Sequence, residues 1–406
     1  MNRLFVFFLL VLWGCSKESA VDSAKSSTFV RYFNGSFEDE AQALLETADK
    51  GLVILANTNF DSKKRVNLIK TDEFGNLIWQ KFYPETEIAN TSYSGYSISL
   101  TPSGGYVIVG EKIQGTAPSL LIITTDADGN SPVENTMTLS NRKGLGVAVN
   151  STGNFLVVSS ISSQPSFNIV LSEFSKTSLN PIWSRTYGAG ALNPGNSLPN
   201  KLFVDAQDVA YWGGTVIKTN QKSSMRFIKT PPNSPNVLFD LTLGKPTDTE
   251  FSGDMIRYGN NFAFIGTSQT GTDSITVRRV TESGIQIFSR GYLIKQEDSK
   301  ELLTGEIRGN SLTVAQDGGL VLLGTIGIGP RGTVSTNTNY CLIKIDGFGN
   351  ATPVWTKIIG GRFNDSGKSI ITTSDGGHVI LGTTTLANVN SLLLMKVDKD
   401  GNIPGL

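Results

Sequence analysis

One apolar stretch recurs along the chain, and this recurrence limits the possible folds more than any other feature. Its clearest copies read "GGYVIVGE", "GGLVLLGT" and "GGHVILGT". Seven copies begin at Lys50, Gly104, Gly153, Asp208, Asn260, Gly318 and Gly376. Successive copies are 49 to 58 residues apart. This spacing indicates a repeat architecture built from seven like units.

Each unit reads as four short strands. A strand such as "KSIITTS" at Lys368 precedes the apolar stretch, and a second apolar run follows it. A turn of the "DxxGN" type, which is typical of hairpins, leads to a last strand such as "LIWQKFY" at Leu77. Four-stranded sheets at this period predict an all-β fold, a seven-bladed β-propeller of antiparallel blades. Because blades cover one another, we expect both strands of the innermost pair to be buried on both faces and the outermost strand to alternate.

The two ends of the chain predict how the ring closes. The sequence stops after a third strand and its turn, "MKVDKDGNIPGL", without a fourth strand. The missing strand has a counterpart near the start, where "FVRYFNG" from Phe29 parallels "VWTKIIGG" from Val354. We therefore expect the N-terminal strand to complete the last blade, so that no blade edge stays open. Residues 28–406 then form a single domain.

Two segments also carry a helix signal. "EDEAQALLETADKG" from Glu38 is rich in Ala, Glu and Leu and ends in Gly, which favours a helix. The repeat register instead requires an inner strand over Gln42–Thr47, and we follow the register. "KQEDSKELL" from Lys295 lies between two units and is compatible with a helical turn.

The first fifteen residues, "MNRLFVFFLLVLWGC", have the pattern of an export signal. Arg3 precedes an apolar run, Leu4–Trp13, that is too short to span a bilayer. The run ends in Gly14 and Cys15, which resembles the lipobox of bacterial lipoproteins; an ordinary secretory signal is the alternative. The resemblance implies a signal peptide over residues 1–14, diacylglycerol on Cys15, and a flexible tether over 15–27. It also implies an anchor in the outer membrane, and "SKES" after the cysteine resembles the export signals of surface lipoproteins.

The repeats resemble the "D-G-G-Y-[IV]-[IL]-x-G" propellers of secreted proteins and lipoproteins from Bacteroidetes-like bacteria. The resemblance covers residues 28–406 and is faint in the fourth unit, where "DAQDVAYWGG" lacks the usual glycine turn. It implies the fold and the envelope location. It implies no shared activity, so no residue role is carried over.

Composition excludes several kinds of chemistry. The chain has 35 basic residues (Lys and Arg) and 35 acidic residues (Asp and Glu), so its charge does not favour binding to nucleic acid. His378 is the only histidine, which excludes the usual Ser/His/Asp and Cys/His sites. The turns at Asp126–Asn130 and Asp398–Asn402 resemble the opening of a calcium loop, but hairpin turns explain them as well. We therefore expect no metal site and no cofactor.

Loops of variable length fall on one rim of the expected ring, where binding surfaces usually lie. The candidate binding residues on that rim are Tyr93, Tyr96, Asn196, Glu306, Arg308, Arg331, Arg362 and Asp365. Aromatic, Arg and Asn side chains suit a glycan or a protein partner. The sequence therefore favours a binding module rather than an enzyme.

The alternative is a carbohydrate-active enzyme, a glycosidase or a lyase, with acidic residues near the axis. Candidate acids just ahead of the inner strands are Asp39, Glu250, Asp254, Glu306 and Asp365.

Overall fold

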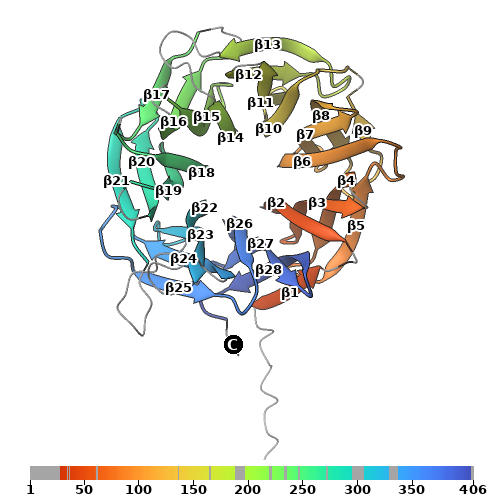
Figure 1. Cartoon of the computed structure of the whole chain (residues 1–406). Coiled ribbons are helices and arrows are strands. Elements are labelled where there is room, and N and C mark those ends of the chain that lie inside the picture. Colours follow the sequence, from red (N-terminus) through yellow and green to blue (C-terminus); the bar gives the residue numbers. More distant parts are fainter. Residues whose placement is uncertain are drawn as a thin grey trace, which may run out of the picture.

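The computed structural model shows a seven-bladed β-propeller, which confirms the expected fold (Figure 1). It describes residues 28–33, 35, 37–60, 63–135, 137–163, 166–187, 197–218, 222–232, 236–245, 247–270, 273–294, 306–328 and 337–403, without the side chains of 162–167 and 197–199. Each blade is a sheet of four antiparallel strands. Residues 1–27, where the sequence predicts a signal peptide, a lipidated Cys15 and a tether, lie outside the described residues.

The strands run outward from the central channel in chain order. Blade 1 holds β2 (Glu38–Glu46), β3 (Leu52–Phe60), β4 (Lys63–Thr71) and β5 (Leu77–Tyr83). Blade 2 holds β6 (Thr91–Leu100), β7 (Tyr106–Gln114), β8 (Ala117–Thr125) and β9 (Val133–Glu134). Blade 3 holds β10 (Arg142–Val149), β11 (Phe155–Ser163), β12 (Ser166–Phe174) and β13 (Pro181–Tyr187). Blade 4 holds β14 (Ser197–Val204), β15 (Ala210–Ile217), β16 (Ser223–Thr230) and β17 (Phe239–Leu243).

The remaining three blades complete the ring. Blade 5 holds β18 (Glu250–Tyr258), β19 (Asn261–Ser268), β20 (Ser274–Thr281) and β21 (Gln286–Tyr292). Blade 6 holds β22 (Ile307–Val314), β23 (Leu320–Ile328), β24 (Asn337–Ile345) and β25 (Trp355–Ile359). Blade 7 holds β26 (Asp365–Thr372), β27 (His378–Leu386), β28 (Val389–Val397) and, as its outer strand, β1 (Phe29–Phe33).

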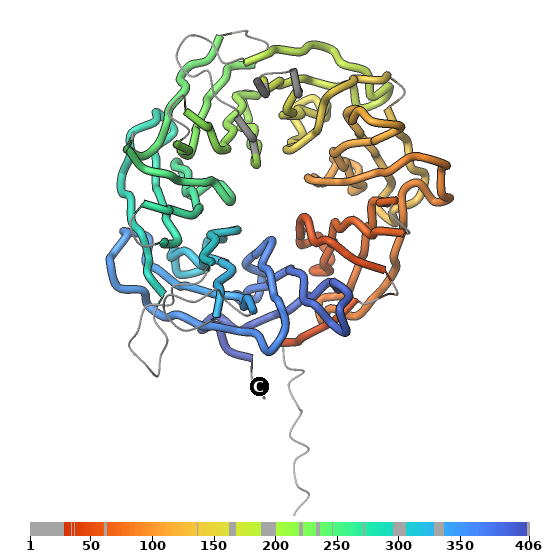
Figure 2. Tube along the Cα trace, in the orientation of Figure 1, coloured from red at the N-terminus to blue at the C-terminus, as the bar shows by residue number. Residues whose placement is uncertain are grey.

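The N-terminal strand closes the ring, as the sequence predicts. β1 pairs antiparallel with β28 over five residue pairs, from Phe29 opposite Lys396 to Phe33 opposite Leu392. In Figure 2 the first described residues, in red, run beside the last ones, in blue. Phe29 is only 6% exposed and belongs to the apolar core between blades 7 and 1. The closing strand therefore adds buried apolar surface as well as ladder hydrogen bonds.

Burial within a blade differs from the expectation at one strand. The second and third strands are buried on both faces, as in β3 and β24, and the outer strands alternate, as in β13. The innermost strand was expected to be buried on both faces, and this expectation was wrong. β2 and β26 alternate between buried and exposed residues in their first halves, because one face of each inner strand borders the central channel.

The final glycine of the repeated motif has a structural cause. Every inner strand carries a β-bulge, and the residue just before the bulge pairs with that glycine in the second strand, as in Gly95 opposite Gly110 and Gly367 opposite Gly382. A Cβ atom on Gly110 would lie 1.8 Å from the Ser94 carbonyl oxygen. The seven residues at the position of Gly110 are Ala56, Gly110, Ser159, Gly214, Gly266, Gly324 and Gly382. The motif thus keeps a small residue where the bulge presses two strands together.

The helix alternative for the segment from Glu38 is wrong, because residues Glu38–Glu46 form the inner strand β2. Tertiary pairing overrides local propensity here. The segment 295–303 lies outside the described residues. Across the part of the chain that the structure describes, no helix is long and apolar enough to cross a membrane.

Candidate active site

The seven bulges direct six side chains and one glycine toward the axis of the ring. The bulged residue of each inner strand is in turn Gln42, Tyr96, Leu145, Asn200, Gly253, Asn310 and Lys368. All seven line one cavity of about 610 Å³. A bulge changes the direction of a side chain and leaves its residue unpaired in the ladder. Side chains at these positions can therefore contact a bound molecule.

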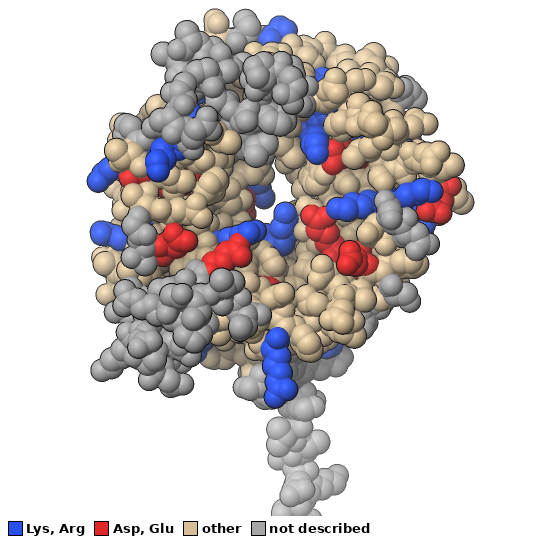
Figure 3. All heavy atoms as spheres, viewed as in Figure 1, with Lys and Arg blue, Asp and Glu red and all other residues tan. Residues whose placement is uncertain are grey.

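The cavity opens toward the rim that carries the variable connections. In an antiparallel blade, the second-to-third hairpins and the links between blades share one rim. The cavity wall includes Gln269 and Asp273 from the link between β19 and β20, and Glu306 from the link that enters β22. Figure 3 shows basic and acidic side chains gathered around the opening of the channel.

Three basic residues line the cavity, and two of them are held by acids. Lys201 Nζ lies 3.6 Å from Asp254 Oδ1, and Ser311 Oγ donates a 2.7 Å hydrogen bond to Asp254 Oδ2. Arg308 forms an ion pair with Glu306, and both side chains are about half exposed. The third basic residue, Lys368, projects from the bulge of blade 7.

Tyr96 reaches a buried acid through its hydroxyl. The Tyr96 hydroxyl donates a hydrogen bond to Glu111 Oε1, and Lys143 Nζ lies 2.9 Å from the other oxygen, Glu111 Oε2. Burial, together with the hydrogen bond to Glu111 and its charge, raises the pKa of Tyr96 well above the ordinary value for tyrosine. Tyr96 therefore stays protonated at neutral pH, and because its one hydroxyl hydrogen is donated to Glu111, the oxygen can accept a hydrogen bond in the cavity.

The predicted binding residues divide into four groups. Tyr96, Glu306 and Arg308 come together in the axial cavity. Tyr93 and Asp365 are buried inside their blades, and Arg362 is exposed away from the cavity. Asn196 and Arg331 lie outside the described residues.

The sequence did not single out several residues of the site: Gln42, Asn200, Lys201, Asn310 and Lys368. A detectable signal existed for the bulge residues. Each follows a small or constrained residue at the same place in its repeat, namely Ala41, Gly95, Gly144, Pro199, Ser252, Gly309 and Gly367.

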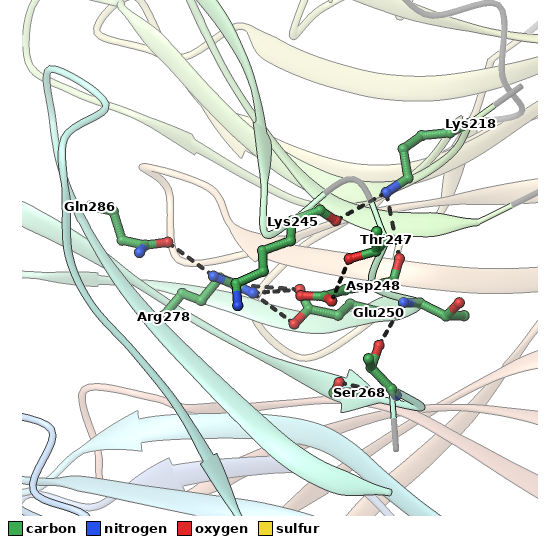
Figure 4. Close-up of polar contacts among 10 residues, drawn as sticks. Lys218, Lys245, Thr247, Asp248, Glu250, Ser268, Arg278 and Gln286 are labelled. Carbon is green, nitrogen blue, oxygen red and sulfur yellow. Dashed lines mark hydrogen bonds and ion pairs between the residues drawn. The ribbon is translucent and has the colours of Figure 1, made fainter. Parts of the chain in front are cut away.

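The predicted acids also separate. Asp254 and Glu306 line the cavity, whereas Asp39, Glu250 and Asp365 share a register position three residues before the bulge and are buried. Glu250 accepts hydrogen bonds of 2.6 to 3.2 Å from the Arg278 guanidinium, which also donates to Gln286 Oε1 at 2.9 Å (Figure 4). This ion pair connects the inner strand of blade 5 with its third strand. Its role is structural.

A second cavity of about 440 Å³ lies where β1 meets blade 1. Its wall is partly aromatic, with Phe33, Phe37, Phe60 and Phe82, and Asp39 also lines it. Asp39 is 7% exposed, and burial raises its pKa to about 6.

The described residues contain no group of three or more His, Cys, Asp or Glu side chains that could hold a metal ion. In the turns that resemble calcium loops, Asp126 Oδ1 and Asp398 Oδ1 accept hydrogen bonds from backbone N–H groups of their own turns. His378 is fully buried, its Nδ1 lies 3.1 Å from Thr372 Oγ1, and burial lowers its pKa. Cys341 is buried, and burial raises the pKa of its thiol to about 12.

Comparison with known proteins gives structural matches only. No protein-family model matches the chain, and no curated protein matches it either. Among solved structures, a polysaccharide lyase of the ulvan lyase family PL25, bound to -[GlcA(1-4)Rha3S]-, has a TM-score of 0.60 at 7% identity, over 91% of this chain and 97% of that chain. The polysaccharide lyase Uly1 has a TM-score of 0.53 at 9% identity, over 95% of both chains. At such identities the likeness shows a shared fold.

These matches correct the leading expectation from the sequence. A binding module without catalysis was expected, but the two proteins described above, which share the fold over more than nine-tenths of both chains, are polysaccharide lyases. The expectation that the protein is not an enzyme is contradicted in the same way. The carbohydrate-active enzyme that the sequence left as the alternative is the better interpretation.

Proposed function

We propose that this protein is a polysaccharide lyase that cleaves an acidic, uronate-containing chain in the axial cavity. The observation that carries the proposal is the cavity wall itself. Lys201, Arg308 and Lys368 line it together with the amide side chains of Gln42, Asn200 and Asn310. Basic and amide groups bind and neutralise a carboxylate, and this acidifies the hydrogen on the adjacent carbon.

The state of the acids favours elimination over hydrolysis. A glycosidase requires two carboxyl groups that flank the bond, one as acid and one as base or nucleophile. In this cavity, Asp254 is held by Lys201, Ser311 and the backbone N–H of Met255, and Glu306 is held by Arg308. Two of the three acids in the cavity wall, Asp254 and Glu306, are therefore paired with basic side chains. Asp273 then has no second free carboxyl group with which to form the acid and base pair of a glycosidase.

The matched ulvan lyase supports this substrate class, since it is described in complex with a glucuronate-containing saccharide. We further propose that the enzyme is attached to the outer membrane through Cys15. The apolar run behind Arg3 and the Gly14–Cys15 pair support this attachment. Globomycin, which blocks cleavage of lipidated precursors, should make a larger precursor accumulate, and Cys15→Ser should abolish incorporation of labelled palmitate; processing that globomycin leaves unchanged would contradict the anchor.

The experiment that tests the activity is a screen of the full chain against uronate-containing and neutral polysaccharides. Elimination creates a carbon–carbon double bond that absorbs ultraviolet light, and it also creates a new reducing end. We expect both signals with uronate polymers and neither with neutral ones. Reducing ends without absorbance would indicate a hydrolase, and no cleavage of any polymer would overturn the proposal.

A matched pair of variants connects the activity to the cavity. Arg308→Gln removes a cation from the wall, and Arg362→Gln removes one that is exposed elsewhere. We expect Arg308→Gln to raise KM for the acidic substrate and Arg362→Gln to leave it unchanged. Equal effects of the two would show that the axial cavity is not the binding site.

A further inference from the structure

The repeat provides an internal comparison for one residue of the cavity, Lys368. Seven backbone bulges occupy the same register position, so the fold alone does not dictate their side chains. Six of the seven are Gln, Tyr, Leu, Asn, Gly and Asn. Lys368 alone carries an amine. Gly367 before it is a close-contact position, since a Cβ there would lie 2.8 Å from Leu323 side-chain atoms.

Lysines at structural positions of this ring are paired, and Lys368 is not. Lys70, Lys344 and Lys396 occupy equivalent places in blades 1, 6 and 7, are 5% to 8% exposed, and each lies 2.6 to 2.8 Å from the aspartate of the neighbouring turn. Within the described part of the chain, no carboxylate lies within ion-pair distance of Lys368 Nζ and no hydrogen bond fixes it. The amine is therefore free to contact a molecule in the cavity.

The surroundings of Lys368 lower its pKa. The side chain is exposed to the channel, but the surrounding walls partly desolvate it and this lowers the pKa of Lys368; the charges of Glu40 and Asp254 oppose the shift. Glu40 is itself paired with Lys64. The other titratable groups of the cavity wall are Tyr96, Lys201, Asp273, Glu306 and Arg308.

We propose that Lys368 is the catalytic base that removes the hydrogen next to the substrate carboxylate. This assignment rests on the lyase function proposed above and gives that reaction its proton acceptor. The Nζ lone pair takes the proton from the carbon that bears the carboxylate. The electrons of that C–H bond form the double bond to the neighbouring carbon, whose bond to the glycosidic oxygen breaks. The ammonium then gives the proton to the departing oxygen, so the enzyme returns to its starting state.

Two substitutions separate a base from a mere positive charge. Lys368→Arg keeps the charge but cannot accept a proton, because the guanidinium stays protonated. Lys368→Met removes both. Loss of a general base slows turnover about 100-fold to 10,000-fold, and we expect a fall of this size in kcat for both variants, with KM little changed in Lys368→Arg. Lys399→Arg, in the exposed turn after β28, is the control and should match the wild type.

A second measurement does not depend on activity. NMR titration of the ¹³C-dimethylated full chain, with Lys368→Arg to assign the signal, should show Lys368 titrating below the other lysines. A titration at or above the ordinary lysine value overturns the assignment. Thermal melts establish that the variants are folded.

The outcomes distinguish this inference from the proposed function. If the wild type cleaves uronate polymers by elimination and Lys368→Arg keeps its kcat, Lys368 is not the base and the lyase function stands. If the wild type cleaves none of them, both proposals fall. Elimination by the wild type, with turnover lost in both Lys368 variants and retained in Lys399→Arg, supports both.

Discussion

Asp39 provides a sharp test of the electrostatics at the ring closure. It is 7% exposed, and its Oδ1 accepts a 2.5 Å hydrogen bond from Thr58 Oγ1, which in turn accepts one of 2.9 Å from Asn67 Nδ2. Burial raises the pKa of Asp39 from 3.8 to about 6, and the hydrogen bonds from Thr58 and Asn67 offset part of that rise. Asp39→Asn keeps an acceptor for Thr58 and removes the titration.

The size of the effect follows from the shift. One pKa unit corresponds to about 1.4 kcal/mol, so a rise from 3.8 to about 6 costs the ionised folded state about 3 kcal/mol. The sign follows from linkage: the folded state binds the proton more tightly than the unfolded state. The penalty is therefore absent below the unfolded pKa near 4, grows as the pH rises, and is complete above about 6.

The assay is chemical denaturation of wild type and Asp39→Asn at about pH 4 and about pH 7.5, on either side of the titration. We expect the free energy of unfolding of the variant, relative to the wild type, to rise by up to about 3 kcal/mol between the two pH values. Comparison of the two proteins cancels the titration of all other groups.

Asp49→Asn is the control of opposite sign. A hydrogen bond from Lys70 holds the pKa of Asp49 at about 2, so its ionised form stabilises the fold. This variant should lose stability relative to the wild type as the pH rises through the acid range. If the difference in the free energy of unfolding between wild type and Asp39→Asn is the same at both pH values, the claim that burial raises the pKa of Asp39 is refuted.

Three further predictions concern the packing of the ring, and chemical denaturation measures each of them. Arg278→Met should cost about 3–5 kcal/mol because it strands the buried Glu250 carboxylate, whereas the double variant with Glu250→Leu should recover most of that loss; equal costs would contradict a coupled pair. Gly110→Ala should destabilise strongly because its Cβ meets a backbone oxygen, whereas Gly361→Ala, with open space, should stay within about 0.5 kcal/mol. Phe29→Ala should cost about 3–5 kcal/mol if the N-terminal strand closes the ring, and a neutral result would contradict that closure.

The fold was predictable because the sequence repeats its own constraints. Seven spaced apolar stretches gave the number of blades, and the missing last strand gave the closure at Phe29. The segment from Glu38 shows the value of the repeat. Its composition favours a helix, but a helix there would remove an inner strand from the ring. The burial of the innermost strands was not predictable from apolar content alone, since the width of the channel is a property of the closed ring.

The site was harder to predict because it depends on strand register. Attention to variable loops selected Tyr96, Glu306 and Arg308, which the structure brings together in the axial cavity, but it also selected Tyr93 and Asp365, which are buried. These last two precede the bulge by three residues, and their side chains lie inside the blade. A shift of one residue in register exchanges the two faces of a strand. A bulge causes such a shift, and its position can be assigned only when the pairing with the neighbouring strand is known.

Once the register is known, comparison of equivalent positions in the seven blades distinguishes residues that the fold requires from residues that are available for function. Positions that keep one residue type in many blades meet a requirement of the ring: small residues face each other before the bulge, and lysines pair with turn aspartates in three blades. The bulge itself keeps no residue type, although its backbone is the same in all seven blades. A position with constant geometry and variable chemistry is free of packing demands. For that reason a lone amine such as Lys368 can face the cavity without weakening the sheet that carries it.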